Sequence, residues 1–301
     1  MTLTADLQGR GAIVTGAGKG LGRAYALHLA SRGAKVLVNN RRHAGESDAQ
    51  TSAAQTVAAI RAAGGAADAN WNDVNDPQSG ITMVQQALER FGVLDIVVAN
   101  AGADRPTAFH KQSLSDFRAI FDTSFFGNLH LAHAAWPHLL QQGYGRMVLT
   151  ASSAGLHSNH GQSAYSAAKA AVIGLMRALA IEGRRRDVRV NVIAPYGYSQ
   201  MTAPYMDPTM ADSFDPALVA PLVGWLCSPQ CDVTGEVLVS GAGLVRRAGT
   251  GESDALALRQ GSVGDVVHAL QDKALRGYPS ANDSFARFLQ ELARHSAETV
   301  P

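Results

Sequence analysis

A tyrosine and a lysine four residues apart lie in a segment whose apolar residues recur at helical spacing. Tyr165 and Lys169 occur in the stretch 163–182, and residues four apart on a helix lie on the same face. A phenol loses its proton only near pH 10, but a neighbouring ammonium stabilises the phenolate and lowers its pKa. The pair could therefore move a proton to or from a substrate oxygen near neutral pH. Taken alone, the same spacing also describes an ordinary pair on a helix surface.

Glycines gather near the N-terminus, between a predicted strand at 11–15 and a helical pattern that begins at residue 21. In this position the backbone N–H groups of a loop approach a pyrophosphate, which the positive end of the helix dipole also attracts. The loop predicts a dinucleotide-binding site, and a tight packing turn is the alternative. The loop residues expected at the cofactor are Gly16, Gly18, Lys19, Gly20, Leu21 and Gly22.

Three motifs occur in one order along the chain. They are Gly-x-x-x-Gly-x-Gly at 16–22, Asn-Ala-Gly at 100–102 and Tyr-x-x-x-Lys at 165–169. In these motifs and their separations the chain resembles the short-chain dehydrogenases/reductases. The resemblance implies an oxidoreductase that interconverts a secondary alcohol and a ketone with a nicotinamide dinucleotide. It also implies that Tyr165 transfers the hydroxyl proton, while Lys169 in addition holds the nicotinamide ribose.

The same resemblance implies a catalytic serine. Ser152 lies thirteen residues before Tyr165, which is the spacing of the family's serine that orients the substrate oxygen; Ser153 is the adjacent alternative. The family usually has an asparagine on the preceding long helix, which relays protons to the lysine through a water. Ser124 stands at that position here, and Asn128 one turn later is not expected to be equivalent. Ser124 could hold the water of an altered relay, but a hydroxyl has fewer donors than an amide. This departure weakens the expectation of a proton relay and leaves the expected chemistry unchanged.

Basic residues near the expected adenosine end favour NADP. The second predicted strand, 35–38, is followed by Asn40 and Arg41, and no acid occurs before Glu46. NAD sites commonly place a carboxylate here to bind the ribose 2′-hydroxyl, whereas arginine binds a phosphate with two hydrogen bonds. Arg41 and Lys19 therefore predict NADP, and NAD with Asn40 at the hydroxyl is the alternative. The resemblance adds these cofactor contacts: Asp73, Val74, Asn100, Ala101, Gly102, Pro195 and Thr202.

Short apolar strands alternate with helical patterns along residues 10–245. Strands are expected at 11–15, 35–38, 66–71, 94–99, 146–150, 189–193 and 236–239. This alternation predicts a doubly wound α/β fold of the Rossmann type, with a seven-stranded parallel sheet and helices on both faces. We expect one dinucleotide-binding catalytic domain over residues 1–245.

Residues 246–301 begin with a linker-like stretch and carry helical patterns at 266–274 and 284–294. They predict a C-terminal helical extension that packs on the main domain or on a partner subunit, and an unpacked tail is the alternative. Two long helices are expected earlier, at 115–142 and 163–182. In the related proteins these helices form subunit interfaces, so the resemblance implies a homodimer or homotetramer.

Longer matches narrow the resemblance to one branch of the family. Segments 20–27, 135–138, 179–183, 219–227 and 241–243 look like the (R)-3-hydroxyacyl-CoA dehydrogenase part of peroxisomal multifunctional enzyme type 2. The branch implies a small-molecule substrate of the 3-hydroxyacyl-CoA/3-ketoacyl-CoA class. Similar stand-alone proteins act in fatty-acid or steroid catabolism, so a hydroxysteroid or alicyclic alcohol is the alternative substrate.

The segment after Pro195 is rich in aromatic and thioether side chains, which suit a broad apolar ligand. Some of these side chains could instead simply pack against the domain. Two histidines between Ser152 and Tyr165 are further candidates for substrate contact. The expected substrate residues are His157, His160, Tyr196, Tyr198, Met201, Tyr205 and Met206.

Composition excludes several classes of protein. The 301 residues carry a formal net charge of +1, so a general nucleic-acid binder is not expected. Two Cys are too few to build a secreted scaffold held by disulfides in a chain of this length. The sequence predicts neither a signal peptide nor a membrane span, so we expect a cytoplasmic protein. Ten His include close pairs, but no acid or thiol clusters with them, so no metal is expected. A dinucleotide sensor without turnover is the alternative class, against which the combination of Ser152, Tyr165 and Lys169 argues.

Overall fold

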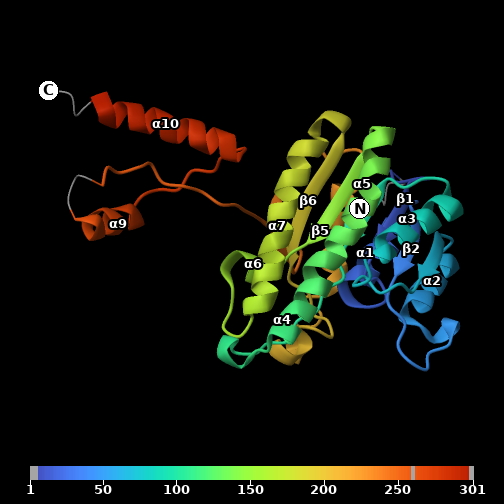
Figure 1. The fold of residues 1–301 in the computed structure, drawn as a ribbon. Helices are drawn as coiled ribbons and strands as arrows, with labels where there is room; N and C mark the ends of the chain where they lie inside the picture. The colour runs from blue at the N-terminus through green and yellow to red at the C-terminus, as the bar shows by residue number, and fades with distance from the viewer. Residues whose placement is uncertain (1–5, 259–261, 298–301) are drawn as a thin grey trace. The chain divides into compact units, whose positions relative to one another are not determined.

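Parallel strands alternate with helices in the computed structural model, which describes residues 6–258 and 262–297 (Figure 1). The chain divides into two units, Met1–Arg247 and Ala248–Pro301. The strands are β1 (Gly11–Val14), β2 (Lys35–Asn39), β3 (Ala66–Asn70), β4 (Ile96–Ala99), β5 (Gly145–Thr150), β6 (Val188–Pro195), β7 (Val237–Gly241) and β8 (Leu244–Ala248). The α-helices of the first unit are α1 (Gly20–Ser31), α2 (Ser52–Ala62), α3 (Gln78–Phe91), α4 (Leu114–Phe121), α5 (Gly127–Gln142), α6 (Ser153–His157), α7 (Ser163–Gly183) and α8 (Ala220–Leu226).

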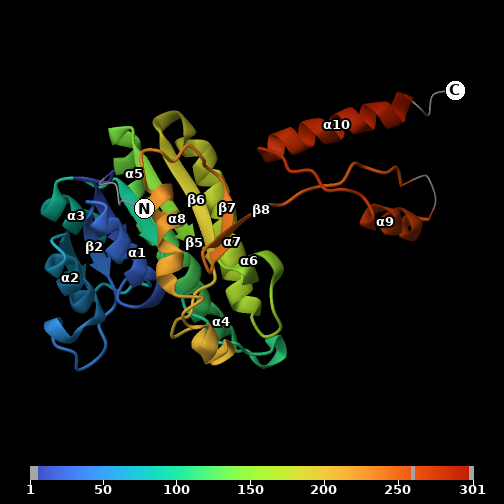
Figure 2. The same ribbon diagram turned by 180° about the vertical axis from the view of Figure 1, so that it is seen from behind.

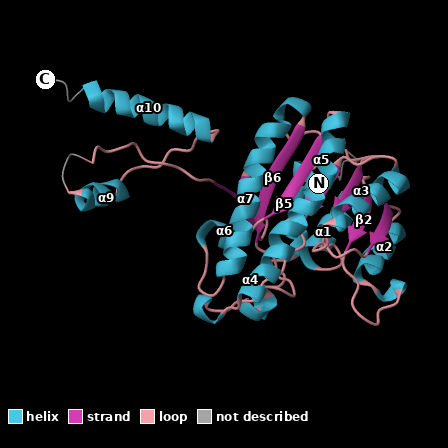
Figure 3. Ribbon diagram, viewed as in Figure 1, coloured by secondary structure: helices cyan, strands magenta, loops and turns pink. Residues whose placement is uncertain are grey.

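The eight strands form one sheet in the order β3-β2-β1-β4-β5-β6-β7-β8. Neighbouring strands from β3 to β7 pair in parallel. Every residue of β1, β4 and β5 is buried, as expected for strands covered on both faces. Helices α3, α5 and α7 cover one face (Figures 1 and 3), and α1, α2 and α8 lie on the other (Figure 2). The predicted doubly wound α/β fold is confirmed.

The chain order reverses between β1 and β4, which lie side by side in the middle of the sheet. In open α/β sheets, ligands bind at the carboxyl ends of the strands where such a reversal leaves a crevice. The fold thus brings together the ends of β1, β4, β5 and β6, although these strands lie far apart in the sequence.

Strand β8 was not predicted, and it makes the sheet one strand larger than expected. Ala242 and Gly243 have φ values of 51° and 72°, and two residues with positive φ form the tight turn that joins neighbouring strands in a hairpin. The chain therefore folds back directly after β7. The stretch from residue 246, expected to be linker-like, instead continues β8 to Ala248.

The predicted continuous helix over 115–142 is interrupted. A π-helical turn, Asp122–Phe126, separates α4 from α5. The buried side chain of Asn128 donates a hydrogen bond from Nδ2 to the backbone oxygen of Ser124 (3.0 Å). A side chain that takes a carbonyl in this way competes with the regular helical hydrogen bonds, and single π-helical turns frequently occur at functional sites.

Helix α7 with the turn that follows it, Ser163–Arg186, is the one described segment apolar and long enough to cross a bilayer by composition. It packs against β5 and β6, and 44% of its most apolar window is buried inside the protein. Packing in the core accounts for its apolar character.

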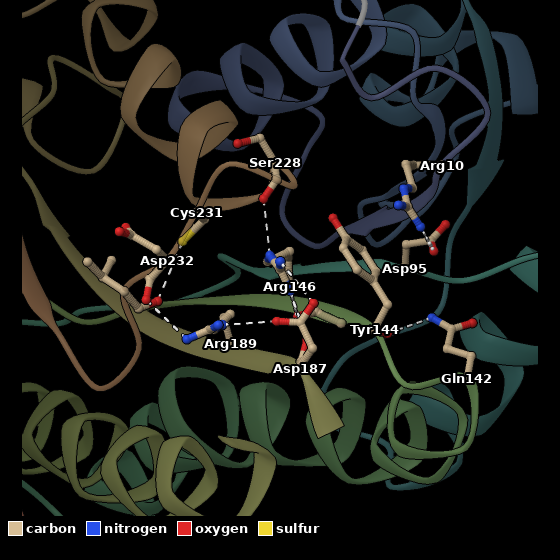
Figure 4. A network of polar contacts seen from close by, with 12 residues as sticks. Arg10, Asp95, Gln142, Tyr144, Arg146, Asp187, Arg189, Ser228, Cys231 and Asp232 are labelled. Atoms are coloured by element: carbon tan, nitrogen blue, oxygen red, sulfur yellow. Dashed lines mark hydrogen bonds and ion pairs between the residues drawn. The ribbon is translucent and has the colours of Figure 1, made fainter. Parts of the chain in front are cut away.

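A network of charged groups lies at the amino-terminal edge of the sheet (Figure 4). The Arg146 side chain is only 2% exposed. Its guanidinium donates to the backbone oxygens of Ser228 (3.1 Å), Gly145 (2.9 Å) and Asp187 (2.8 Å). It also lies 4.3 Å from the ring centre of Tyr144. One side chain therefore connects the starts of β5 and β6 to the segment after α8.

Replacing Arg146 by Met is expected to lower the free energy of unfolding by about 3 kcal/mol, because several buried carbonyls lose their donors. Urea unfolding would measure the change. Arg189→Met is the matched control: its side chain is 27% exposed, and we expect a loss of about 1 kcal/mol. Equal losses in the two variants would contradict the proposed role of burial.

The second unit contains α9 (Val263–Gln271) and α10 (Ala281–Ala297). Arg287 on α10 contacts Asp254 (3.1 Å) and Glu291 (2.6 Å), and Glu252 and Arg276 form an antiparallel bridge. These contacts connect the segment before α9 to α10 within the unit. Within the unit, the apolar face of α10 that carries Phe285 and Leu289 remains exposed.

Candidate active site

A cavity of about 530 Å³ lies at the carboxyl ends of the central strands. Its walls come from the glycine loop after β1, the ends of β2, β4, β5 and β6, the first turns of α7 and the segment after β6. The predicted cofactor residues that line it are Gly16, Lys19, Gly20, Leu21, Gly22, Asn40, Arg41, Asp73, Val74, Asn100, Ala101, Gly102, Tyr165, Lys169, Pro195 and Thr202. The fold thus brings nearly all of them to one cavity.

The glycine loop leaves no room for a side chain at Gly18 or Gly22. A Cβ atom on Gly22 would lie 2.3 Å from the backbone oxygen of Gly16, and one on Gly18 would lie 2.2 Å from Oγ of Ser52. Gly16 has a φ of 63°, a conformation that glycine adopts without strain. The backbone of Gly16–Gly22 can therefore approach a pyrophosphate closely. Gly18 itself lies behind the loop and does not line the cavity.

Asn100 holds the glycine loop against the end of β4. Its Nδ2 donates to the backbone oxygen of Thr15 (3.0 Å), and the Thr15 hydroxyl accepts from the backbone N–H groups of Asn100 (3.0 Å) and Ala101 (3.1 Å). The Asn-Ala-Gly motif therefore connects two neighbouring strand ends and keeps the cavity floor in place.

Polar and basic groups surround the adenosine end of the cavity. The Asn40 amide donates to Oγ of Ser52 (3.0 Å). Nη1 of Arg41 lies 3.9 Å from Oδ2 of Asp73, and 61% of the Arg41 side chain is exposed. Arg41 is thus positioned at the rim by a carboxylate, with its other guanidinium nitrogens open to an anion.

Tyr165 and Lys169 lie on the first two turns of α7, with Nζ of Lys169 5.7 Å from the centre of the Tyr165 ring. Lys169 is 2% exposed, and its Nζ donates to the backbone oxygen of Thr150 (2.6 Å). Burial lowers the pKa of Lys169 to about 8. The amine therefore loses its proton much closer to neutral pH than a solvated lysine does.

A lowered Tyr165 pKa is expected from the ammonium together with the positive nicotinamide ring of a bound cofactor, and the chain by itself acts in the opposite direction. Burial raises it to about 12, the Ser152 hydroxyl lowers it, and the charge of Asp104 raises it further. Within the chain, burial decides the pKa of this phenol, because desolvation disfavours its charged form. The serine that forms a hydrogen bond with the Tyr165 phenol is Ser152. This agrees with the sequence spacing, which favoured Ser152 over Ser153 as the serine that orients the substrate oxygen.

Residues 10–208 match the family model described as short chain dehydrogenase. The chain belongs to this family. It is an oxidoreductase that acts on CH–OH groups, and the family uses NAD or NADP as cofactor.

Similar proteins occur in bacteria and animals. The chain is 39% identical over 272 residues to a short-chain type dehydrogenase/reductase of Mycobacterium tuberculosis, covering 90% of this chain and 93% of the relative. It is 42% identical over 239 residues to mouse peroxisomal multifunctional enzyme type 2, covering 79% of this chain but only 32% of the relative. The chain thus spans about a third of the mouse enzyme. A solved short chain dehydrogenase from Mycobacterium avium has a TM-score of 0.81 at 36% identity, over 90% of this chain and 97% of that one.

Ser124 does not line the cavity of this dehydrogenase, although the sequence placed it in a proton relay. It is completely buried; its Oγ donates to the backbone oxygen of Ala103 (2.8 Å) and accepts from the backbone N–H of Ala103 (3.0 Å). The single proton of the hydroxyl is already donated, so no donor is left for a relay. Ser124 therefore positions the segment after β4, and the altered relay through its hydroxyl is not supported.

The structure separates the predicted substrate residues into two groups. Tyr196, Met201, Tyr205 and Met206 line the cavity, and they follow β6 as expected. Three other side chains do not line it: His157, His160 and Tyr198. The α6 segment instead brings Asn159 and Gln162 to the wall.

Sequence reasoning missed Asp104, Asn159 and Gln162 as cavity residues. Gln162 could have been found, because it lies three residues before Tyr165 at the start of the same helix and three-residue spacing keeps side chains on one face. Asp104 carries no such signal. It reaches the site through an irregular loop, whose course no periodic pattern predicts.

Proposed function

We propose that this dehydrogenase interconverts a 3-hydroxyacyl-CoA and a 3-ketoacyl-CoA with NADP as cofactor. The observation that carries the reaction type is the gathering of Ser152, Tyr165 and Lys169 in the cavity that also contains the glycine loop. Those three residues provide an orienting hydroxyl, a proton carrier and a cation at one place. A cofactor-sensing protein has no need of all three.

The cofactor fits the residues present. The glycine-loop backbone would hold its pyrophosphate, and Lys169 would hold the ribose beside the reaction centre. A bound nicotinamide supplies the two-electron chemistry as acceptor or donor of a hydride.

The chain's own residues handle the proton. In oxidation, the Tyr165 phenolate accepts the hydroxyl proton as the carbinol carbon becomes a carbonyl carbon; in reduction, the phenol returns that proton to the oxygen. Ser152 orients the same oxygen by a hydrogen bond. The Lys169 ammonium favours the phenolate by its charge, against the desolvation that raises the pKa of Tyr165.

Charge at the rim supports NADP over NAD. Lys19 and Arg41 line the adenosine end. A 2′-phosphate there would accept hydrogen bonds from the guanidinium, which binds a phosphate group better than it binds a neutral hydroxyl. The Asn40 amide is engaged with Ser52. Asn40 carries no charge that would repel a phosphate, and the carboxylate at this end of the cavity, that of Asp73, lies beside the Arg41 guanidinium.

Two observations support the acyl-CoA class. The relatives include enzymes named peroxisomal multifunctional enzyme type 2 and 3-oxoacyl-[acyl-carrier-protein] reductase. The wall formed by Tyr196, Met201, Tyr205 and Met206 suits an apolar acyl group. The same wall favours a hydroxysteroid or alicyclic alcohol as the second candidate.

An oligomer is also proposed. Along α4 and the π-helical turn, Phe117 stacks on Phe121 (centroids 5.8 Å apart) and Phe121 meets Phe125 edge to face (5.9 Å), and all three remain partly exposed. Aromatic residues are enriched at the buried centre of protein interfaces. This face supports a homodimer or homotetramer built on these helices.

A steady-state comparison of cofactors and substrates tests the proposal. We expect acetoacetyl-CoA to be reduced at least tenfold faster, in kcat/KM, with NADPH than with NADH. Reduction of a ketosteroid alone would favour the second candidate. Equal or better rates with NADH would contradict the roles of Lys19 and Arg41.

A further inference from the structure

A carboxyl group that the mechanism does not use lines the cavity near Tyr165. Asp104 accepts a short hydrogen bond from Nε2 of Gln162 through Oδ2, and both residues belong to the cavity wall. Gln162 precedes Tyr165 by three residues at the start of α7, so Asp104 is connected directly to the turn that carries the proton donor.

The backbone on either side of Asp104 is held in place. Ala103 is bound through both its N–H and its carbonyl by the buried hydroxyl of Ser124. The N–H of Thr107 donates to the backbone oxygen of Gly161 (2.7 Å). The loop 103–107 is thus fixed at one end to the π-helical turn and at the other to the segment before α7. The loop therefore holds the Asp104 carboxyl group in position, so that it does not turn into solvent.

The second carboxyl oxygen, Oδ1 of Asp104, is completely buried and has no hydrogen-bond partner among the described residues. A buried polar atom without a partner carries its full desolvation penalty, and such atoms in folded proteins call for an explanation. A leucine of similar size would avoid that penalty at this position. A carboxyl group kept here at this cost indicates a functional role. Because Oδ1 is closed to solvent, a ligand would meet Oδ2, whose lone pairs can accept a second hydrogen bond beside the one from Gln162.

We propose that Asp104 is a specificity-determining residue, which accepts a hydrogen bond from an O–H or N–H group on the substrate close to the reacting carbon. This inference rests on the proposed oxidoreductase function and adds a polar requirement to it. The preferred substrate then has a hydroxyl or an amino group near its secondary alcohol or ketone, in addition to the apolar part that faces Met201 and Tyr205.

The electrostatics of the site agree with this assignment. Burial raises the pKa of Asp104, whereas the hydrogen bonds that it accepts from the Gln162 side chain and the Arg105 backbone lower it. A donor from the substrate would favour the carboxylate in the same way as Gln162 does. It would also reduce the repulsion between Asp104 and a phenolate at Tyr165, since part of the negative charge would then be bound.

Matched substrates that differ by one donor test the proposal. Reduction with NADPH would be compared for acetoacetyl-CoA and 4-hydroxy-3-oxobutanoyl-CoA. Oxidation with NADP would be compared for cyclohexanol, trans-cyclohexane-1,2-diol and trans-2-aminocyclohexanol. We expect the wild-type enzyme to prefer the donor-bearing member about tenfold or more in kcat/KM. A larger factor for the amine than for the diol would identify N–H as the preferred donor, and the reverse would identify O–H.

The preference should depend on the carboxylate. Asp104→Leu is expected to reduce the ratio to about one, while Asp104→Asn, which keeps one acceptor oxygen, retains part of it. Asp232→Leu removes an exposed carboxylate outside the cavity and should leave the ratio unchanged. NADPH binding, followed by fluorescence, shows whether each variant is folded.

The outcomes separate the two proposals. Turnover with the same ratio in wild type and Asp104→Leu would overturn the role of Asp104 and leave the proposed function intact. A donor preference that disappears in Asp104→Leu, in whichever pair reacts, would support the role. No reaction with any of these substrates would overturn both proposals.

Discussion

Replacement of Tyr165 by Phe is expected to lower kcat/KM about 10³-fold while affinity for NADPH stays within about twofold of wild type. General acid–base catalysis by one side chain contributes a factor of this size, and Phe keeps the ring that forms part of the cavity wall. Loss of the hydroxyl removes the group that exchanges a proton with the substrate oxygen. Steady-state kinetics and fluorescence titration with NADPH measure the two effects.

Tyr25 offers a matched control for this substitution. It lies on α1 with its side chain buried in the core, and its hydroxyl has no hydrogen-bond partner among the described residues. Tyr25→Phe should leave kcat/KM unchanged and raise stability slightly, because an unsatisfied buried hydroxyl is removed. If Tyr165→Phe retained most of the wild-type turnover, Tyr165 would not be the proton carrier. If the wild type bound NADPH but turned over no substrate, the sensor alternative would gain support.

Lys169→Met is expected to inactivate the enzyme and at the same time to stabilise it by about 2 kcal/mol at pH 7. The amine is buried, and its pKa of about 8 lies below the ordinary value of 10.5, so folding disfavours its charged form. A shift of this size corresponds to about 3 kcal/mol, from which the lost hydrogen bond to Thr150 subtracts about 1 kcal/mol. Urea unfolding of both proteins measures the difference.

The sign of the pH dependence follows from the same shift. Between about pH 8 and 10.5 the unfolded chain binds a proton at Lys169 that the folded protein has released, so wild-type stability rises with pH in this window. The stability advantage of the Met variant should therefore be largest below pH 8 and decline toward pH 10.5.

The rate of ketone reduction by the wild-type enzyme should fall as pH rises through about 8, because a neutral amine no longer stabilises the phenolate.

Lys35 provides the control for Lys169. Its Nζ also donates to a backbone oxygen, that of Phe91 (3.2 Å), but it does not line the cavity. Lys35→Met should keep wild-type activity and show no gain in stability. An unchanged or lower stability of Lys169→Met at pH 7 would contradict the view that function keeps an unfavourable buried charge at this position.

Local pattern was sufficient for those parts of the site that lie within one element. Tyr165 and Lys169 share a helix face because of their spacing alone, and the glycine loop follows from its place between a strand and a helix. These predictions depend on contacts a few residues apart. The interruption at Asp122–Phe126 was missed, because helical periodicity does not report local contacts such as the hydrogen bond from the Asn128 side chain to the backbone oxygen of Ser124.

The amino-acid sequence by itself determined the α/β alternation, because backbone geometry and burial impose that pattern locally. Its three motifs indicated the family, and the resemblance to that family implied most of the residues that meet at the carboxyl ends of the strands. Only the tertiary structure decided the role of Ser124, the exclusion of His157 and His160 from the cavity and the inclusion of Asp104. The tertiary structure also decided that burial, rather than a neighbouring charge, dominates the pKa of Tyr165. Desolvation and loop position depend on which distant segments surround a group, and no short-range spacing in a chain encodes those surroundings.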